Sequence, residues 1–276
     1  MIFYFTPGGR IGNQLFQYAR AYAEASQNEL IVFGQMEEFI SIFQINRKIV
    51  NIKNGLVLKA FERCLFPLLR QLLVKTGLVS SILEIDGIEK RRKGIVDRIK
   101  WIEGYFQKAS FATPAFIKDI KVKSSFDIAA RDFLSRNCVT GSFAFIHVRR
   151  GDYLNFEVLG QKDPSLPAEF YLRALKSLGF NAGETTLVLL GDDPCFVEKA
   201  AITAGWKTVV SNLAPSADFA LMLSADGGVV SNSTFAWWAG KMSGKKIAAP
   251  LYWLGWKSSR WYPEGIEDGS FLWVKV

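Results

Sequence analysis

The chain has 276 residues, 49% hydrophobic and 22% charged, which is enough apolar material for one large or two moderate domains and unlike a disordered chain. Its formal net charge of +8 lies in one half: residues 1–140 hold 21 Lys and Arg against 13 Asp and Glu, whereas residues 141–276 hold 13 of each. The densest basic run, Lys90-Arg91-Arg92-Lys93, is not interleaved with aromatic residues, so we interpret it as a solvated loop and expect no nucleic acid as a partner.

Short apolar runs alternate with helical patterns along much of the chain, and this alternation is typical of parallel sheets covered by helices on both faces. Between Gln35 and Phe126 few periods are clean, so element boundaries there are poorly defined. The pattern predicts a doubly wound α/β protein. In chain order, strands are predicted at Ile2–Phe5, Leu30–Phe33, Ala144–Val148, Leu187–Leu190, Thr208–Val210, Gly228–Val230 and Ile247–Ala249, and helices at Asn13–Ser26, Ala168–Ser177, Pro194–Ala204, Phe219–Ser224 and Phe235–Met242.

The chain contains no pattern of a signal peptide or a membrane-spanning helix. Met1–Phe5 is too short for the apolar part of a signal peptide, and the longest apolar region, Leu56–Val74, is broken by charged residues. Two interpretations of Leu56–Val74 stay open: a helix packed on its own domain, or a basic amphipathic helix, interrupted at Pro67, that lies on an anionic membrane. We therefore expect a cytoplasmic protein, with peripheral contact with the inner face of the membrane as the open alternative.

The cysteines and carboxylates give no sign of a metal centre. Cys64, Cys138 and Cys195 lie far apart without a C-x-x-C pair, so we expect buried thiols in a reducing compartment. The chain has a single histidine and no Asp-x-Asp pair of the kind that metal-dependent sugar transferases use. Asp192-Asp193 is adjacent rather than spaced, so the two side chains would point to opposite faces of a strand. We expect no metal and no cofactor.

A charged cluster follows one of the predicted strands. The apolar run that begins at Phe145 ends in His147, Arg149, Arg150 and Asp152. In open α/β sheets the ligand lies at this end of the strands, and the planar fork of arginine suits a phosphate. Two interpretations stay open from these residues alone: an anion site with an acid/base group beside it, or a loop in which Arg149 only pairs with Asp152.

Two further segments lie between a strand and a helix. Gly8-Gly9 and Gly12 let the backbone approach a ligand closely, and the N–H groups of the following helical turn attract anions. Ser231-Asn232-Ser233-Thr234 follows the strand near Gly228, where the hydroxyl groups could cap a helix and also donate to a phosphate. Taken singly, the first segment is a tight turn and the second is a helix cap.

Together and in this order, the segments resemble the bacterial and animal α-1,2-fucosyltransferases of glycosyltransferase family 11. Two departures are an extra residue at Arg10-Ile11 and the stretch Ala225–Gly228, where such enzymes often carry Cys and His. The resemblance rests on Gly8-Gly9, Gly12-Asn13-Gln14-Leu15-Phe16-Gln17-Tyr18, Gly104-Tyr105-Phe106-Gln107, His147-Val148-Arg149-Arg150-Gly151-Asp152-Tyr153, Asp218-Phe219-Ala220-Leu221-Met222 and Ser231-Asn232-Ser233-Thr234-Phe235-Ala236-Trp237-Trp238.

The resemblance implies a glycosyltransferase-B-like α/β fold, with two Rossmann-like domains facing each other across a donor/acceptor cleft. Residues 1–140 would form the acceptor-side domain, and residues 141–276 the GDP-fucose-binding domain. The implied enzyme is an inverting, metal-independent galactoside α-1,2-fucosyltransferase, a hexosyltransferase that moves L-fucose from GDP-fucose to the 2-hydroxyl of a terminal β-galactose. The acceptor would be a galactose-terminated oligosaccharide or lipid-linked glycan, as in O-antigen biosynthesis. The alternatives are a transferase with another nucleotide sugar or acceptor position, and a non-catalytic glycan- or phosphate-binding module.

The resemblance also assigns roles to residues. Arg149 would hold the diphosphate, Arg150 would face the other way, and His147 would contact ribose or guanine as a neutral imidazole. Asp152, Glu157 and Asp193 are the candidates for the proton acceptor, and the family does not decide among them. The complete prediction has Arg149, Asp152 and Glu157 as catalytic residues, His147, Arg149, Gly12, Asn13, Asp193, Asp218, Ser231, Asn232, Ser233, Thr234 and Phe235 at the donor, and Asn13, Gln14, Tyr153 and Trp238 at the acceptor.

Tryptophans gather late in the chain. Trp237 and Trp238 lie on a predicted helix, and Trp253, Trp256 and Trp261 lie near the end. Their rings could stack against a sugar or a guanine. Because most tryptophans are largely buried, we interpret each of them as a core residue and keep stacking as the alternative.

Overall fold

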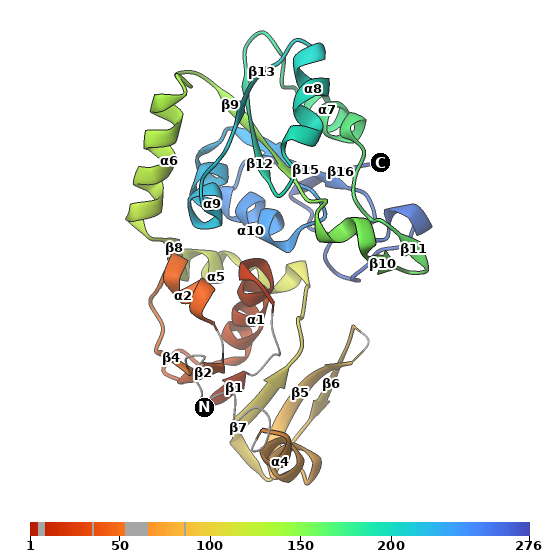
Figure 1. Ribbon diagram of the computed structural model, residues 1–276. Coiled ribbons are helices and arrows are strands. Elements are labelled where there is room, and N and C mark those ends of the chain that lie inside the picture. Colours follow the sequence, from red (N-terminus) through yellow and green to blue (C-terminus); the bar gives the residue numbers. More distant parts are fainter. Residues whose placement is uncertain (5–8, 35, 53–65, 86) are drawn as a thin grey trace. The chain divides into compact units, whose positions relative to one another are not determined.

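The computed structural model describes residues 1–4, 9–34, 36–52, 66–85 and 87–276. The chain divides into two compact units, Met1–Lys121 and Val122–Val276 (Figure 1). The sequence places this boundary later, at residue 140. The difference arises because α6 (Ser124–Arg136) packs on α9 (Pro215–Ser224) and so belongs to the second unit.

The second unit contains a six-stranded parallel sheet in the order β13-β12-β9-β14-β15-β16. From β9 the chain runs outward to β12 and β13, then returns to the other side of β9 and runs outward again from β14 to β16. The strand order therefore reverses between β9 and β14. The elements are β9 (Phe143–Val148), β12 (Thr186–Gly191), β13 (Lys207–Val210), β14 (Gly227–Val229), β15 (Lys246–Pro250), β16 (Phe271–Val274), α7 (Ala168–Ser177), α8 (Cys195–Thr203) and α10 (Thr234–Ser243).

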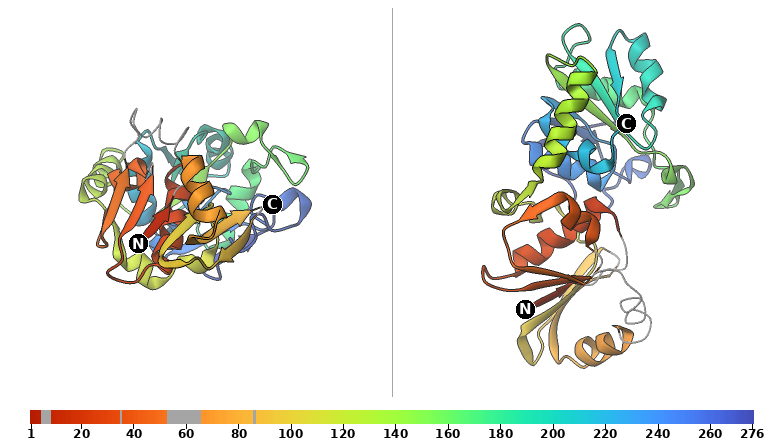
Figure 2. Two further views of the ribbon diagram at one scale, coloured as in Figure 1. Left: turned by 90° about the horizontal axis from the view of Figure 1, so that it is seen from below. Right: turned by 60° about the vertical axis from the view of Figure 1, so that its left-hand side comes forward.

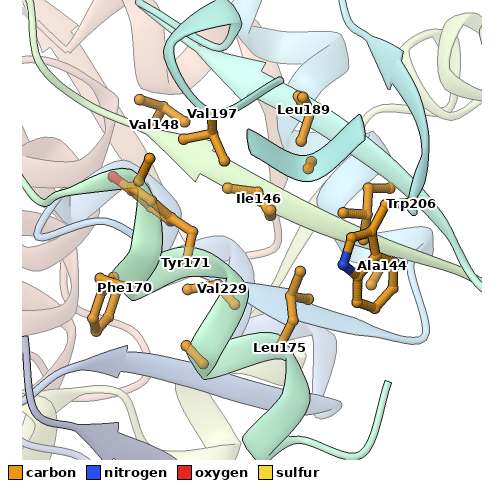
Figure 3. Packing of buried hydrophobic residues seen from close by; sticks show 14 of the residues in the cluster. Ala144, Ile146, Val148, Phe170, Tyr171, Leu175, Leu189, Val197, Trp206 and Val229 are labelled. Carbon is orange, nitrogen blue, oxygen red and sulfur yellow. The ribbon is translucent and has the colours of Figure 1, made fainter. Parts of the chain in front are cut away.

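All six residues of β9 are buried, because helices cover both faces of this sheet (Figure 2). Alternate side chains of a strand point to opposite faces. Ala144, Ile146 and Val148 pack with α7, where Phe170 and Tyr171 are fully buried (Figure 3). The remaining side chains of β9 face α9 and α10, as the contact between the rings of His147 and Phe235 shows.

The first unit repeats this plan with the described strands in the order β4-β2-β1-β7-β5-β6, all parallel except β6. Here the order reverses between β1 and β7. Helices α1 and α4 lie on opposite faces of the sheet (Figure 2). The elements are β1 (Ile2–Tyr4), α1 (Ile11–Glu24), β2 (Ile31–Gly34), α2 (Glu37–Ile42), β3 (Phe43–Ile45), β4 (Ile49–Ile52), α4 (Phe66–Arg70), the π-helical turn η2 (Gln71–Lys75), β5 (Val79–Ile85), β6 (Ile88–Arg92), β7 (Val96–Glu103), α5 (Pro114–Asp119) and β8 (Ile120–Val122), which pairs with β3.

The basic run predicted as a solvated loop lies in a strand instead. Lys90, Arg91 and Arg92 belong to β6, and Lys93 follows directly. Arg91 pairs with Glu89 at 2.7 Å, and Arg92 donates to the carbonyl oxygen of Lys75 at 2.9 Å. Since β6 is the edge of the sheet, its row of charged side chains opposes pairing with a strand of another molecule.

Two other sequence expectations concern solvent exposure. Cys138 and Cys195 are exposed, so the expectation of buried thiols is wrong for both, and Cys64 lies outside the described residues. Of the predicted amphipathic region, residues 56–65 also lie outside, and the remainder forms α4 and most of η2. Among the described residues, none of the helices combines the length and apolarity that a bilayer crossing requires.

The close approach of β14 to β9 predicts that Gly228 tolerates no side chain. A Cβ atom there would lie 2.4 Å from Cδ1 of Phe145 and 2.5 Å from its carbonyl oxygen. We expect Gly228→Ala to lower the unfolding free energy by about 1–3 kcal/mol, measured as a lower melting temperature. Gly141→Ala is the matched control, because a Cβ at Gly141 would meet nothing within 4 Å. Equal melting temperatures for both variants would contradict this account of the sheet.

Candidate functional site

The carboxyl ends of β9 and β14 lie side by side where the strand order of the second sheet reverses. In an open α/β sheet, the loops diverge at this point and leave a crevice that binds the ligand. Of the predicted residues His147–Asp152, the first two end β9 and the rest follow it, and Ser231–Phe235 follow β14. The fold therefore brings these two segments together, and we call them the switch-point site.

His147 is the last but one residue of β9 and is 4% exposed. Its Nδ1 lies 2.8 Å from Oγ of Ser231, so the two strand ends share a hydrogen bond. Burial, together with the positive charge of Arg149, lowers the pKa of the imidazole to about 3. His147 is therefore neutral at physiological pH, and it is too weak a base to take a proton from a sugar hydroxyl.

Arg149 has both sides of its guanidinium engaged by carboxylates. Nη2 donates to Oδ2 of Asp152 at 2.8 Å, and Nη1 pairs with Oδ2 of Asp192 at 3.3 Å. The ring of Tyr153 lies 5.7 Å from the guanidinium carbon. Asp152 is 63% exposed, and exposed ion pairs contribute at most about 1 kcal/mol. A diphosphate could therefore replace Asp152 as a partner of Arg149.

Arg150 points toward α8. Its guanidinium carbon lies 3.5 Å from the ring centroid of Phe196, and Nη1 pairs with Asp193 at 3.1 Å. The two adjacent arginines thus diverge, Arg149 toward Asp152 and Asp192 and Arg150 toward Phe196 and Asp193. Asp193, predicted as a donor ligand, has Arg150 as its partner in this structure.

Asp192 holds the loop that carries both arginines. Its carboxylate accepts from the backbone N–H of Arg150 at 2.8 Å and from that of Gly151 at 3.2 Å, in addition to its pair with Arg149. The preceding Gly191 has φ of 123°, and a Cβ there would lie 2.0 Å from the carbonyl oxygen of Val148. The sequence analysis considered Asp192 only as a possible metal ligand and assigned it no role in this loop. Its position two residues beyond the predicted strand Leu187–Leu190 was the one indication that it lies at the same edge of the sheet.

The segment after β14 is tied to its surroundings by backbone and side-chain bonds. Ser233 occupies the N-cap position of α10, as expected, but its hydroxyl makes no capping hydrogen bond. Asn232 is 1% exposed; its Nδ2 donates to the carbonyl oxygen of Pro164 at 2.8 Å, and its own carbonyl oxygen accepts from the Tyr153 hydroxyl at 2.8 Å. The positive end of the α10 dipole therefore faces the switch-point site.

Asp218 lies in the first turn of α9 and is 8% exposed. Burial raises the pKa of its carboxyl group to about 6, although the hydrogen bond from Oγ of Ser211 at 2.5 Å opposes this shift. The neighbouring ring of Phe219 packs against Phe235 at 5.4 Å, and Phe235 packs against His147. Ring contacts thus connect Phe219, the residue after Asp218, to the switch-point site.

The first unit has a corresponding pair of loops after β1 and β7. Oδ1 of Asn13 accepts from Nε2 of Gln107 at 2.9 Å. Oε2 of Glu84 accepts from the N–H groups of Tyr105 and Phe106, both at 2.7 Å, and so fixes the loop that presents Gln107. The segment Gly104–Gln107 is part of the family resemblance, but the sequence analysis assigned no role to Gln107 and did not identify Glu84.

Two residues of α1 that were predicted to contact substrates, Asn13 and Gln14, have partners within the first unit instead. The backbone N–H of Asn13 donates to the carbonyl oxygen of Arg10 at 2.9 Å, so it does not serve as a phosphate donor in this conformation. Gln14 is 5% exposed; its Nε2 donates to the carbonyl oxygen of Gly9 at 3.0 Å and its Oε1 accepts from the N–H of Phe39 at 2.9 Å. Gln14 therefore braces the loop, with no surface toward an acceptor. Gly12 is buried within α1.

Trp238, which was predicted to contact the acceptor, is buried in the core. It is 0% exposed, with its ring centroid 5.0 Å from that of Trp237, so the expectation of contact with a sugar is wrong and the core interpretation holds. Tyr153 stacks on Phe156 at 6.1 Å beside Arg149. Glu157 is exposed in β10 (Glu157–Val158), which pairs with β11 (Gln161–Lys162).

Over the described ranges of the chain, no group of three or more His, Cys, Asp or Glu side chains is arranged to hold a metal ion.

The chain is similar to two glycosyltransferases. An alpha-1,2-colitosyltransferase of Escherichia coli is 25% identical over 247 residues, which cover 83% of each chain. The galactoside 2-alpha-L-fucosyltransferase Sec1 of Mus musculus is 25% identical over 251 residues, which cover 86% of this chain and 63% of the relative.

A solved structure and a family model complete the comparison. The crystal structure of NodZ alpha-1,6-fucosyltransferase soaked with GDP-fucose has a TM-score of 0.53 and 12% identity, and the match covers 87% of this chain and 92% of NodZ. This likeness shows the glycosyltransferase-B-like fold with its Rossmann-like units. The model of glycosyl transferase family 11 matches residues 1–250, so the chain belongs to glycosyltransferase family 11.

Proposed function

We propose that this protein is an inverting galactoside α-1,2-fucosyltransferase, which moves L-fucose from GDP-fucose to the 2-hydroxyl of a terminal β-galactose. The acceptor is a galactose-terminated oligosaccharide or a lipid-linked glycan. The observation that carries the proposal is the switch-point site, where a neutral His147 is hydrogen-bonded to Ser231, just before α10, and Arg149 follows on the same strand end. The likeness to a galactoside 2-alpha-L-fucosyltransferase supports the linkage and the sugar.

The departure of GDP sets the chemical demand on the site. Negative charge grows on the diphosphate while the sugar carbon becomes oxocarbenium-like. Arg149 meets this charge with two parallel donors, once the diphosphate has replaced Asp152, and the α10 N-terminus adds its dipole. Removal of one such preorganised donor typically costs about 2.7–4 kcal/mol of transition-state stabilisation.

Inversion also requires a proton acceptor near the galactose hydroxyl. His147 is excluded by its low pKa, and Asp193 is paired with Arg150. Asp152 and Glu157 are both exposed carboxylates in the segment after β9, so we propose the acceptor of the proton is one of these two. Asp218 and Phe235 lie on the nucleotide side of the site in this proposal.

A second candidate differs only in the donor sugar. The Escherichia coli relative is a colitosyltransferase, which favours α-1,2 transfer of another 6-deoxy sugar as the alternative. Metal independence and contact with the inner face of the membrane remain predictions from the sequence.

Incubation of the protein with GDP-fucose, lactose and EDTA tests the proposed reaction. We expect a fucosylated product in which fucose is linked to the 2-hydroxyl of galactose, identified by NMR, at a rate that EDTA leaves unchanged. Absence of product with any galactose-terminated acceptor contradicts the proposed reaction. Loss of activity in EDTA contradicts its metal independence, and product only with another nucleotide sugar supports the second candidate.

Replacement of Arg149 by lysine keeps the charge and removes the fork. We expect Arg149→Lys to lower kcat by about 100-fold or more with little change in KM for the acceptor, because the interaction forms in the transition state. Arg150→Lys is the matched control and should retain most of the activity, since Arg150 points toward Phe196. The measurements are kcat and KM, with melting temperature as the folding control. A larger loss at Arg150 than at Arg149 would show that the diphosphate site is misplaced.

Asp192 should affect turnover through Arg149. In Asp192→Asn the loop keeps a backbone hydrogen bond but loses the charge that orients the guanidinium. We expect kcat to fall by about tenfold, and Asp193→Asn, the adjacent control, to change it much less. If Asp192 acts through Arg149, Asp192→Asn should have almost no further effect in the Arg149→Lys background. Additive losses in the double variant would contradict this coupling.

A further inference from the structure

A pocket of about 450 Å³ opens in the loop that joins β15 to β16 in the second unit. Its wall combines aromatic rings with charged and polar groups, from Tyr252, Ser259, Arg260, Trp261, Glu264 and Glu267. None of these residues belongs to the switch-point site. The volume lies in the range of small-molecule sites.

The backbone of the pocket wall adopts conformations that side chains disfavour. Tyr252, Trp253 and Ser259 have φ of 68°, 53° and 50°, which is the left-handed region. Two consecutive bulky residues in this region are uncommon, and such strain persists only where the surroundings over-determine it, most often at functional sites. Tyr252, Trp253 and Ser259 therefore keep a disfavoured backbone conformation because the surrounding structure holds them in it.

Several contacts hold the loop in this shape. The indole of Trp253 is 0% exposed and packs against Trp273, with ring centroids 6.2 Å apart. Nε1 of Trp237, on α10, donates to the carbonyl oxygen of Ile266 at 3.1 Å. Lys241 of α10 pairs with Asp268 at 2.7 Å. The pocket is thus formed by the folded second unit itself.

The aromatic walls suit the C–H face of a sugar. The rings of Tyr252 and Trp261 lie 5.7 Å apart at 67° to each other, and Trp261 is fixed from behind by Trp273 at 4.9 Å and 89°. Trp261 is only half-buried, so its indole also reaches the pocket. Two other tryptophans of this loop do not line the pocket: Trp253 is core, and Trp256 donates to the carbonyl oxygen of Pro164 at 3.0 Å.

The charged groups on the wall favour a neutral, hydroxyl-bearing ligand. Arg260, Glu264 and Glu267 are exposed, and the ion pairs found among the described residues include none of the three. The two carboxylates oppose an anion, and the guanidinium opposes a cation. Hydroxyl groups can donate to the carboxylates and accept from the guanidinium at the same time.

The loop between β15 and β16 and the switch-point site both form hydrogen bonds to the segment that precedes α7. Lys257 donates to the carbonyl oxygen of Lys162 at 2.7 Å, in β11. The carbonyl oxygen of Pro164 accepts from Trp256 at 3.0 Å and from Asn232 at 2.8 Å. The pocket therefore lies in a loop that packs on the segment between Tyr153 and α7, where the sequence analysis placed the candidate base Glu157.

We propose that this pocket is a second carbohydrate site, which takes a neutral hexose of a glycan through stacking on Trp261 and hydrogen bonds to Glu264 and Glu267. In the transfer reaction it would hold a sugar of the acceptor beyond the disaccharide that carries the reacting galactose. This last part rests on the proposed function, whereas binding of the hexose itself does not.

The test compares lactose with a β-galactose-terminated tetrasaccharide as acceptor. We expect Trp261→Ala to raise KM for the tetrasaccharide about tenfold and to leave KM for lactose and both kcat values unchanged. Trp261→Phe, which keeps an aromatic face, should restore most of the affinity. Tyr262→Ala is the matched control, because it removes a 45% exposed ring of the same loop that does not line the pocket.

Equal effects of Trp261→Ala on the two acceptors, or no effect on either, would overturn the proposal. Should Trp261→Ala fail to fold, Glu264→Gln carries the same comparison. Binding of the tetrasaccharide, followed by saturation-transfer NMR, separates this proposal from the proposed function. If the wild type turns over neither acceptor, the proposed function is wrong. The second carbohydrate site is then still supported if the wild type binds the tetrasaccharide and Trp261→Ala abolishes this binding. It is contradicted if the wild type does not bind the tetrasaccharide.

Discussion

Burial of β9 decides where the second unit can place polar groups. The strand has a neighbour on each side and helices on both faces, and all six of its residues are buried. A charge within such a strand would be costly, so the charged groups stand beyond its carboxyl end. His147, the one titratable residue inside the strand, is neutral and shares a hydrogen bond with Ser231. The parallel pairing of β9 and β14 places both strand ends at one edge of the sheet, and the reversal of strand order there directs the following loops apart.

The cations at this edge carry their own counter-ions. Arg149 lies between Asp152 and Asp192, and Arg150 between Asp193 and the ring of Phe196. The carboxylates differ in how they are held: Asp192 also accepts two backbone N–H groups, whereas Asp152 is largely exposed. In the proposed function, this difference lets Asp192 orient the guanidinium while a phosphate replaces Asp152.

Sequence reasoning located the elements with strong apolar patterns and missed those with mixed ones. The predicted helix Ala168–Ser177 agrees with α7 at both ends, and β9 extends the predicted strand by one residue. Strand β6 has no buried residue and α6 has two, Ala130 and Phe133, so neither shows a period. The switch-point residues were predictable because strand order fixes them. The roles of Gln14 and Asp192 were not, since each has a partner distant in sequence, Phe39 for Gln14 and Arg150 for Asp192.

In the proposed reaction, Arg149 and the N-terminus of α10 hold the diphosphate of the donor. A crystal structure of the protein with GDP bound tests it most directly. We predict phosphate oxygens within hydrogen-bonding distance of the Arg149 guanidinium and of the residues that begin α10. The ion pair between Arg149 and Asp152 should be broken, and the hydrogen bonds from the backbone of Arg150 and Gly151 to Asp192 should be intact. A diphosphate bound elsewhere, with Arg149 still paired to Asp152, would contradict it.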